Sequence, residues 1–294
     1  MQRKLMQLSD AARLVPSGSC ITIGGSIIRR TPVAFVRELI RQGVTDLHVL
    51  GFPAGITTDM LAGVGALRRV EAVYEGLFQF GMAHNFRRGV EAGEIEVRDF
   101  PETAMIARFR AASQGISFMP TKVLLGTGMA KHNPEQIREI TCPFTGEKYH
   151  AVQAATSDFT VLHGYVGDEF GNVQWPVQRD SDDIDFIQAK AAKRLIVTVE
   201  RIVPHAEIAR QPTLTYVPHQ WVEAIVEVPY GAHPGSCDGY YDEDEEHMLY
   251  YQECAKDPAR FKEYAATYIY GVTDHWDYLQ KAVTVKRLSQ LSVR

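Results

Sequence analysis

Short apolar runs rich in β-branched residues alternate with longer amphipathic stretches along the first part of the chain. The runs Cys20–Ile23, Leu47–Leu50 and Val70–Tyr74 each end close to a glycine, which predicts buried strands followed by loops. Thr31 and Pro32 predict the start of the first intervening helix, with Thr31 as its cap and Pro32 as its first residue. Repeated strand–loop–helix units predict an α/β fold with an open, mostly parallel sheet and helices on both faces.

The alternation weakens between residues 118 and 149, where loop-forming residues predominate. We expect a long excursion from the sheet there. Further along, Gly167–Val173 is typical of a hairpin turn, Ser181 predicts the cap of another helix, and Trp221–Val228 predicts a late strand. After Gly239 the pattern predicts helices almost to the end of the chain.

The composition is that of a globular protein with a sizeable core. Of 294 residues, 45% are hydrophobic and 23% are charged. Neither a linker rich in proline, glycine and serine nor a repeat of fixed period divides the sequence. We therefore expect residues 1–294 to form a single domain, with a helical C-terminal segment from about residue 240.

Charge and cysteine content exclude several classes of protein. The net charge is −5 and the basic residues are dispersed, which argues against a nucleic-acid-binding face. Cys20, Cys142, Cys237 and Cys254 form no CxxC pair, so neither a zinc site nor a disulfide framework is indicated. Because no apolar run has the length of a membrane span or a signal peptide, we expect a cytoplasmic protein without a membrane or metal.

The first candidate site is the loop Gly24-Gly25-Ser26, between a predicted strand and the next helix. Backbone N–H groups and the positive end of a helix favour an anion at such a place, and glycine lets it approach closely. Arg29 and Arg30 would add positive charge. The alternative is a tight turn with two solvated arginines, and the complete GxGxxG dinucleotide-binding pattern is absent.

Three more candidates lie at predicted strand ends. Glu75 ends an apolar strand, where the carboxyl ends of parallel strands form the ligand crevice of an α/β sheet. Glu102 begins a helix, and ordinary capping chemistry explains a glutamate there equally well. His233 lies in Tyr230–Asp242, a tight loop after a strand, and such loops often carry sites.

Several blocks in this order give the chain a strong family resemblance. It resembles the α subunits of the family I coenzyme A (CoA) transferases, of the type found in glutaconate CoA-transferase. The blocks are Gly24-Gly25 with Arg30 and Pro32, Arg41–Leu47, Glu91–Gly93, Gly115–Pro120, Val199–Val203 and Tyr230–Pro234.

The resemblance implies a fold of the CoA-transferase type and a partner β subunit, usually in an α2β2 assembly. It also implies a reaction that moves CoA between an acyl-CoA and a carboxylic acid, with no further cofactor. A glutamate of the β subunit would carry CoA as a thioester in ping-pong fashion. This chain would supply walls of the acyl and CoA pocket. The residues expected there are Gly24, Gly25, Ser26, Arg30, Glu75 and His233.

One segment resembles a different branch of the family. Relatives that open a cyclic diketone in steroid-ring degradation are CoA-ester hydrolases, and their catalytic glutamate lies on the α subunit in a segment that Arg98–Glu102 matches. Glu102 would be catalytic in such an enzyme. Gly231–Cys237 is more similar to the transferases, so we expect a transferase rather than a hydrolase. A non-catalytic scaffold role for this chain is the third alternative.

Overall fold

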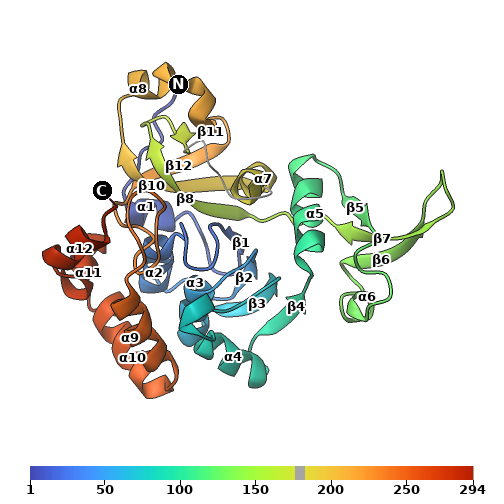
Figure 1. Ribbon diagram of the computed structural model, residues 1–294, viewed down its shortest axis with the longest axis horizontal. Helices are drawn as coiled ribbons and strands as arrows, with labels where there is room; N and C mark the ends of the chain where they lie inside the picture. Colours follow the sequence, from blue (N-terminus) through green and yellow to red (C-terminus); the bar gives the residue numbers. More distant parts are fainter. Residues whose placement is uncertain (176–182, 294) are drawn as a thin grey trace.

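The computed structural model describes residues 1–175 and 183–293, which contain a nine-stranded sheet and a separate three-stranded sheet (Figure 1). The parallel strands of the larger sheet are, in spatial order, β12 (Val222–Glu227), β10 (Arg194–Ile202), β8 (Phe159–Gly167), β1 (Cys20–Ile23), β2 (Leu47–Leu50), β3 (Leu67–Ala72) and β4 (Glu96–Asp99). Two antiparallel strands, β9 (Val173–Gln174) and β11 (Thr215–Val217), extend it beside the end of β8. The predicted mostly parallel sheet is confirmed, as is the hairpin between β8 and β9.

Strand β8 lies at the centre of the sheet. Its residue Phe159 pairs with Ile21 of β1 on one side and with Arg194 of β10 on the other. Nearly all of β8 is buried, because helices cover both faces of the sheet. Strands β1 and β2 begin and end where the sequence predicts, whereas β3 lies a few residues before the predicted Val70–Tyr74.

Alternate side chains of the strands enter cores on opposite faces. Ile21 and Ile23 join the core beneath the N-terminal helices, whereas Leu50 joins a second core with Phe109 and Ile187. The first face is covered by α1 (Leu8–Ala12), α2 (Val33–Arg41), α3 (Ile56–Gly63) and α4 (His84–Glu91). Helices α5 (Glu102–Ser113) and α7 (Ile184–Ala191) contribute residues to the second core. Helix α8 (His205–Arg210) follows β10, and short 3-10 turns occur at Phe78–Phe80 and Pro212–Leu214.

Two predicted helix caps differ from the structure or fall outside it. Pro32, rather than Thr31, precedes the first residue of α2, and no side chain caps this helix. The buried Thr31 hydroxyl has no hydrogen-bond partner among the described residues. Ser181 lies outside the described residues.

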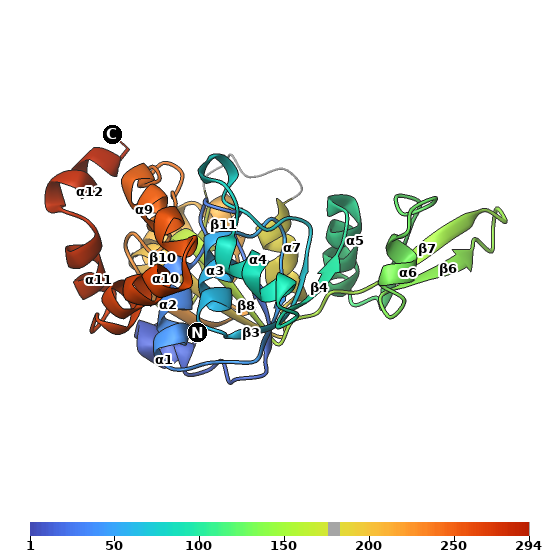
Figure 2. The ribbon, with the colours of Figure 1, turned by 90° about the horizontal axis from the view of Figure 1, so that it is seen from below.

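The excursion after residue 117 is a projecting arm, as Figures 1 and 2 show. It contains β5 (Phe118–Thr121), α6 (Met129–His132), β6 (Ile137–Thr141) and β7 (Lys148–Gln153), with the strands in the antiparallel order β5-β7-β6. The sequence predicted a strand around Val152, which overlaps β7, but it did not predict β5 or β6. Much of β5 and β6 is solvent-exposed, so no clean alternation of apolar and polar residues marks them.

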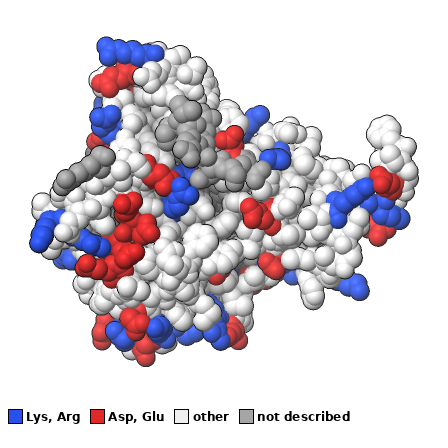
Figure 3. Space-filling model, viewed as in Figure 1, with Lys and Arg blue, Asp and Glu red and all other residues white. Residues whose placement is uncertain are grey.

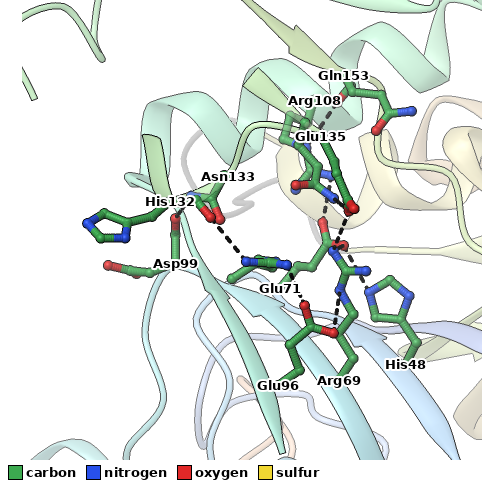
Figure 4. A network of polar contacts seen from close by, with 12 residues as sticks. His48, Arg69, Glu71, Glu96, Asp99, Arg108, His132, Asn133, Glu135 and Gln153 are labelled. Carbon is green, nitrogen blue, oxygen red and sulfur yellow. Dashed lines mark hydrogen bonds and ion pairs between the residues drawn. The ribbon is translucent and has the colours of Figure 1, made fainter. Parts of the chain in front are cut away.

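A buried carboxylate anchors the arm to the main sheet (Figure 4). Glu71 of β3 pairs with His48 at 3.0 Å, Arg69 at 3.2 Å and Arg108 of α5 at 2.7 Å. Arg108 also donates a hydrogen bond to the carbonyl of Gln153 in β7 at 3.0 Å. Burial alone would raise the pKa of Glu71, but the hydrogen bond from His48 and the charge of Arg108 lower it to about 2.

The C-terminal helices pack against the N-terminal half. They are α9 (Glu245–Ala255), α10 (Pro258–Ala265), the π-helical turn Ala266–Tyr270, α11 (His275–Ala282) and α12 (Val285–Leu291). The Tyr251 hydroxyl donates a hydrogen bond to the buried Asp59 carboxylate of α3 at 2.6 Å. Because residues from both ends share one core, we propose that residues 1–294 form a single domain. Within the described residues, each helix is too short or too polar to cross a membrane.

Candidate functional site

Loops after three neighbouring strands are joined at the carboxyl edge of the sheet. The Ile27 N–H, after β1, donates to the Pro53 carbonyl, after β2, at 2.9 Å. The Ala54 N–H donates to the Tyr74 carbonyl, after β3, at 3.0 Å, and the Gly76 N–H returns a bond to Ala54 at 3.2 Å. Open α/β sheets bind their ligands at this edge.

The loop after β12 packs against the loop after β1. The Arg30 N–H donates to the Ser236 carbonyl at 2.8 Å, and the Ser236 N–H donates to the Ile28 carbonyl at 2.8 Å. Gly235 allows this approach, because a Cβ there would lie 2.2 Å from the Ile28 oxygen. The two segments that the sequence singles out, far apart in the chain, are therefore neighbours in space.

Gly24 and Gly25 are both closely packed, and a Cβ on Gly25 would lie 2.6 Å from the Arg29 carbonyl oxygen. A Cβ on Gly24 would lie 2.2 Å from Cδ2 of Leu162. Gly25 has a φ of +80°, and its N–H donates to Oδ1 of Asp185, the second residue of α7, at 3.0 Å. An anion does lie on this loop, and it is a carboxylate of the chain itself.

Arg30 is part of the same arrangement. Its side chain is buried, forms an ion pair with Asp185 and lies 3.5 Å from a carboxylate oxygen of Asp238. Burial opposes the charged form of Arg30, but the neighbouring Asp185 carboxylate raises the pKa of the guanidinium above its ordinary value. Arg29 is exposed and pairs with Asp238 at 2.8 Å, while Ser26 lies partly exposed and exchanges backbone hydrogen bonds with Arg29.

Glu75 lies at the same edge but points inward. Both of its carboxylate oxygens are buried, and no hydrogen bond of acceptable geometry joins them to a described residue. Burial and the charge of Asp59 raise the pKa of Glu75 well above its ordinary value, which the nearby Thr58 hydroxyl opposes. The buried setting therefore disfavours the charged form of Glu75.

His233 is held among the C-terminal helices. It is fully buried, with Nδ1 2.8 Å from the Tyr278 hydroxyl and Nε2 3.2 Å from Asp244. Its carbonyl accepts a hydrogen bond from Arg37 of α2 at 3.0 Å. Burial lowers the pKa of His233 although Asp244 opposes this. With both ring nitrogens used in this way, His233 fastens its loop to the helices and does not face Gly24 and Gly25.

Glu102 is the first residue of α5 and is exposed. Pro101 precedes it, so the predicted first-turn position is confirmed. Because α5 follows the carboxyl end of β4, Glu102 lies at the same edge of the sheet as Glu75.

Beside the loops after β1 and β12 lie two buried groups of polar residues that were not predicted from the sequence. One is the contact of Asp185 with Gly25 and Arg30, for which no sequence motif gives a signal. The other is the group His163, Glu200 and Cys237, whose possible metal-ligand atoms lie within 4.8 Å of one another.

In this second group, the Glu200 carboxylate is already hydrogen-bonded to other side chains. His163 Nε2 lies 2.6 Å from Glu200, and the Tyr241 hydroxyl donates to the same carboxylate at 2.7 Å. Burial raises the pKa of the Cys237 thiol, which disfavours the thiolate that a metal would require. This arrangement supports a hydrogen-bond network rather than a metal centre.

Comparison with known proteins places the chain in a family. The sequence model of the family described as coenzyme A transferase matches residues 5–228. The chain belongs to the coenzyme A transferase family. This member of the family is also 33% identical to the A subunit of glutaconate CoA-transferase from Acidaminococcus fermentans, over 99% of this chain and 95% of that protein.

Two further relatives differ in length or in described activity. An uncharacterised protein of Archaeoglobus fulgidus is 35% identical over 99% of this CoA-transferase chain, which spans 65% of that protein's length. The cholesterol ring-cleaving hydrolase IpdA subunit of Rhodococcus jostii is 31% identical over 93% of this chain and 94% of that protein.

Solved structures agree with this assignment. The crystal structure of glutaconate CoA-transferase from Acidaminococcus fermentans matches with a TM-score of 0.93 at 32% identity, over 99% of this CoA-transferase chain and 96% of the matched one. A variant of the decarboxylase AibA/AibB matches with a TM-score of 0.80 at 30% identity, over 90% of this chain and 100% of the matched one. The predicted fold of the CoA-transferase type is thereby confirmed.

Proposed function

We propose that this chain is the α subunit of an enzyme that transfers CoA from an acyl-CoA to a carboxylic acid. The nucleophilic glutamate belongs to a partner β subunit, in an α2β2 assembly. The chain itself forms walls of the acyl and CoA pocket with the loops that follow β1, β2 and β12. Gly24, Gly25, Ser26 and Arg30 lie in the first of these loops.

The reaction proceeds in two balanced halves. The glutamate carboxylate attacks the thioester carbon of the acyl-CoA, and the CoA thiolate leaves as an acyl–glutamyl anhydride forms. The thiolate then attacks the glutamyl carbon, so that the donor acid leaves and the enzyme holds CoA as a thioester. The acceptor carboxylate reverses both steps to form the new acyl-CoA. No net proton is consumed, and coenzyme A is carried by the substrates.

The observation that carries this proposal is the contact between the loops after β1 and β12. These two loops hold blocks of the transferase resemblance, and their backbones are hydrogen-bonded at the edge where α/β enzymes bind ligands. Both carboxylate oxygens of Glu75 at this edge are buried away from solvent, so the side chain is not open to a substrate, and burial disfavours its charged form. For that reason we assign the nucleophile to the partner.

A second candidate function is supported by one observation. Glu102 is exposed at the carboxyl edge, and its segment resembles the catalytic segment of the ring-opening hydrolases. In a hydrolase, Glu102 would act as the general base or nucleophile toward a CoA ester of a cyclic diketone. The likeness to the IpdA protein of Rhodococcus jostii adds weight to this alternative.

The variant Glu102→Gln distinguishes the two functions, because it keeps the size of the side chain and removes its charge. In the complex with the cognate β subunit, we expect CoA transfer to continue, with a loss of only about 0.3–1 kcal/mol of stability. In the hydrolase, the same change would lower kcat by about 100-fold or more.

Chemical trapping gives an independent test of which glutamate reacts. The complex is incubated with acyl-CoA, treated with borohydride or hydroxylamine, and digested to locate the modified glutamate. A label on the β subunit is the expected result. A label on Glu102 would overturn the transferase assignment.

Surface charge and cysteine content bear on the partners and the compartment of the protein. Figure 3 shows acidic and basic side chains interspersed over the described part of one face, which does not favour binding of a nucleic acid. Cys20, Cys142, Cys237 and Cys254 are all free thiols. Free thiols fit the reducing cytoplasm.

A further inference from the structure

We propose that Asp185 is a positioning residue of the acyl-CoA site, because its carboxylate fills the anion cradle of the Gly24-Gly25 loop and fixes that loop against the sheet. The inference rests on the proposed function, since it assumes that this loop borders the reacting thioester. The anion held by the loop is then internal, and not a phosphate of CoA.

The contacts of Asp185 are specific to a carboxylate. Oδ1 accepts the Gly25 N–H at 3.0 Å, and Oδ2 forms the ion pair with Arg30. A Cβ on Gly24 would lie 3.1 Å from the same Oδ1. Asp185 is 4% exposed, so these contacts are made in a buried setting where charge-assisted hydrogen bonds are strong.

The loop has an unusual backbone that needs such support. Gly25, Ile27 and Arg30 have φ values of +80°, +55° and +52°. A β-branched residue such as Ile27 rarely adopts this left-handed conformation, and strained residues of this kind persist only where surrounding contacts hold them. Backbone hydrogen bonds from the neighbouring loops hold Ile27 and Arg30, and the Asp185 carboxylate adds a buried ionic contact to Arg30 beside the more exposed Asp238.

Asp185 also connects two distant elements of the site. It lies in the first turn of α7, 160 residues after Gly25 in the sequence. A small displacement of α7 would therefore move the loop after β1. Misplacement of a reacting group by about 1 Å can cost about 100-fold in rate, so a residue that never touches the substrate can still control turnover.

Asp158 offers a control with the same kinds of contact at the opposite end of β1, although its side chain is 42% exposed. Its carboxylate accepts the Cys20 N–H at 3.0 Å and pairs with Lys193 at 2.9 Å. Like Asp185, it combines a backbone N–H of the β1 region with a cation. It lies at the amino end of the strand, away from the edge where ligands bind.

The test uses Asp185→Ala and Asp158→Ala in complexes with the cognate β subunit. We expect Asp185→Ala to lower kcat by about 10- to 100-fold, with little change in the KM for acyl-CoA. Nitrate, a planar anion of carboxylate-like shape that cannot accept CoA, should restore part of this activity and raise the Tm of Asp185→Ala. Sulfate at equal ionic strength should do neither. Asp158→Ala should keep wild-type kcat and show no response to nitrate.

A second variant keeps the inference testable if Asp185→Ala does not assemble with the β subunit. Asp185→Asn keeps the size of the side chain and one acceptor oxygen for the Gly25 N–H, but it removes the charge and places an NH2 donor against Arg30, so it should assemble and show the same loss of kcat at unchanged KM. Wild-type kcat in either assembled variant would overturn the inference. An assembled Asp185→Ala complex that gains neither activity nor Tm with nitrate would also overturn it.

The thermal measurement separates this inference from the proposed function. A wild-type complex that transfers no CoA would contradict the proposed function. In that case the nitrate-dependent Tm of Asp185→Ala, compared with that of Asp158→Ala, still decides whether Asp185 fills an anion cradle.

Discussion

Replacing Glu71 by glutamine removes the negative charge from the network that joins β3 to the arm. Glu71 is 3% exposed and pairs with His48, Arg69 and Arg108. Glutamine has a similar size, so the packing is kept while Arg108, itself 3% exposed, loses its buried counter-charge. We expect Glu71→Gln to be strongly destabilising.

The magnitude follows from the pKa of Glu71. A change from 4.5 to about 2 corresponds to about 3 to 4 kcal/mol, at about 1.4 kcal/mol per pKa unit. Removal of one partner from a buried ion pair costs about 3–5 kcal/mol, which agrees. For a chain of this size, each kcal/mol shifts the Tm by about 2 °C, so we expect a fall of about 6 to 8 °C.

The pH dependence has a definite sign. Because the pKa of Glu71 is lower in the folded state, the unfolded state binds the proton more readily. The contribution to stability is therefore fully present above pH 4.5 and is lost as the pH falls through about 2. The difference in stability between wild type and Glu71→Gln should shrink over this same interval.

Urea unfolding, followed by circular dichroism from about pH 7 down to about pH 3, measures both effects. Glu96→Gln is the control, because Glu96 pairs with Arg98 in the same network but its side chain is 43% exposed. It should cost about 0–1 kcal/mol. If Glu71→Gln is no less stable than Glu96→Gln at neutral pH, or if its deficit does not change with pH, our account of the network is wrong.

Three further substitutions test other parts of the structure. Gly25→Ala should lose CoA transfer and be less stable than Gly43→Ala by about 1–3 kcal/mol. Both glycines have a positive φ, but only at Gly25 would a new Cβ lie 2.6 Å from backbone atoms. Measurements of activity and Tm for the two variants test this prediction. Tyr251→Phe should lower the free energy of unfolding by about 1–3 kcal/mol, since Asp59 loses a buried hydrogen bond, and an unchanged urea midpoint would contradict the role of that bond. Phe144→Ser, at a side chain 93% exposed, should change stability by no more than about 0.5 kcal/mol in the same assay.

The main sheet could be predicted because its signals are local. Cys20–Ile23 and Leu47–Leu50 are short β-branched or apolar runs that glycines end sharply, and their bounds agree with β1 and β2. The arm gives a weaker signal, because strands exposed on both faces carry no period of two. The predicted strand Val70–Tyr74 begins and ends a few residues later than β3, because apolar residues continue past the end of the strand.

The site was predictable as two loops but not as a set of contacts. Gly24-Gly25 and Gly231–Cys237 are recognisable as strand-end turns, and the structure joins them. Nothing in the sequence relates Asp185 to Gly25, since a single aspartate 160 residues away has no motif that marks its partner. His233 has the features of a site histidine in its loop, and only the packing of distant C-terminal helices shows that its ring is buried.

The central place of β8 determines the order in which the sheet can be completed during synthesis. Strand β1 pairs with β2 on one side, but its other neighbour follows after Asp158, 138 residues beyond Cys20. At about 5–20 residues per second, the ribosome needs about 7 to 28 seconds to make that stretch. Throughout this time β1 is an open edge that can pair with another chain. Strand β1, which lies in the middle of the finished sheet, is therefore the edge most open to incorrect pairing while the protein is being synthesised.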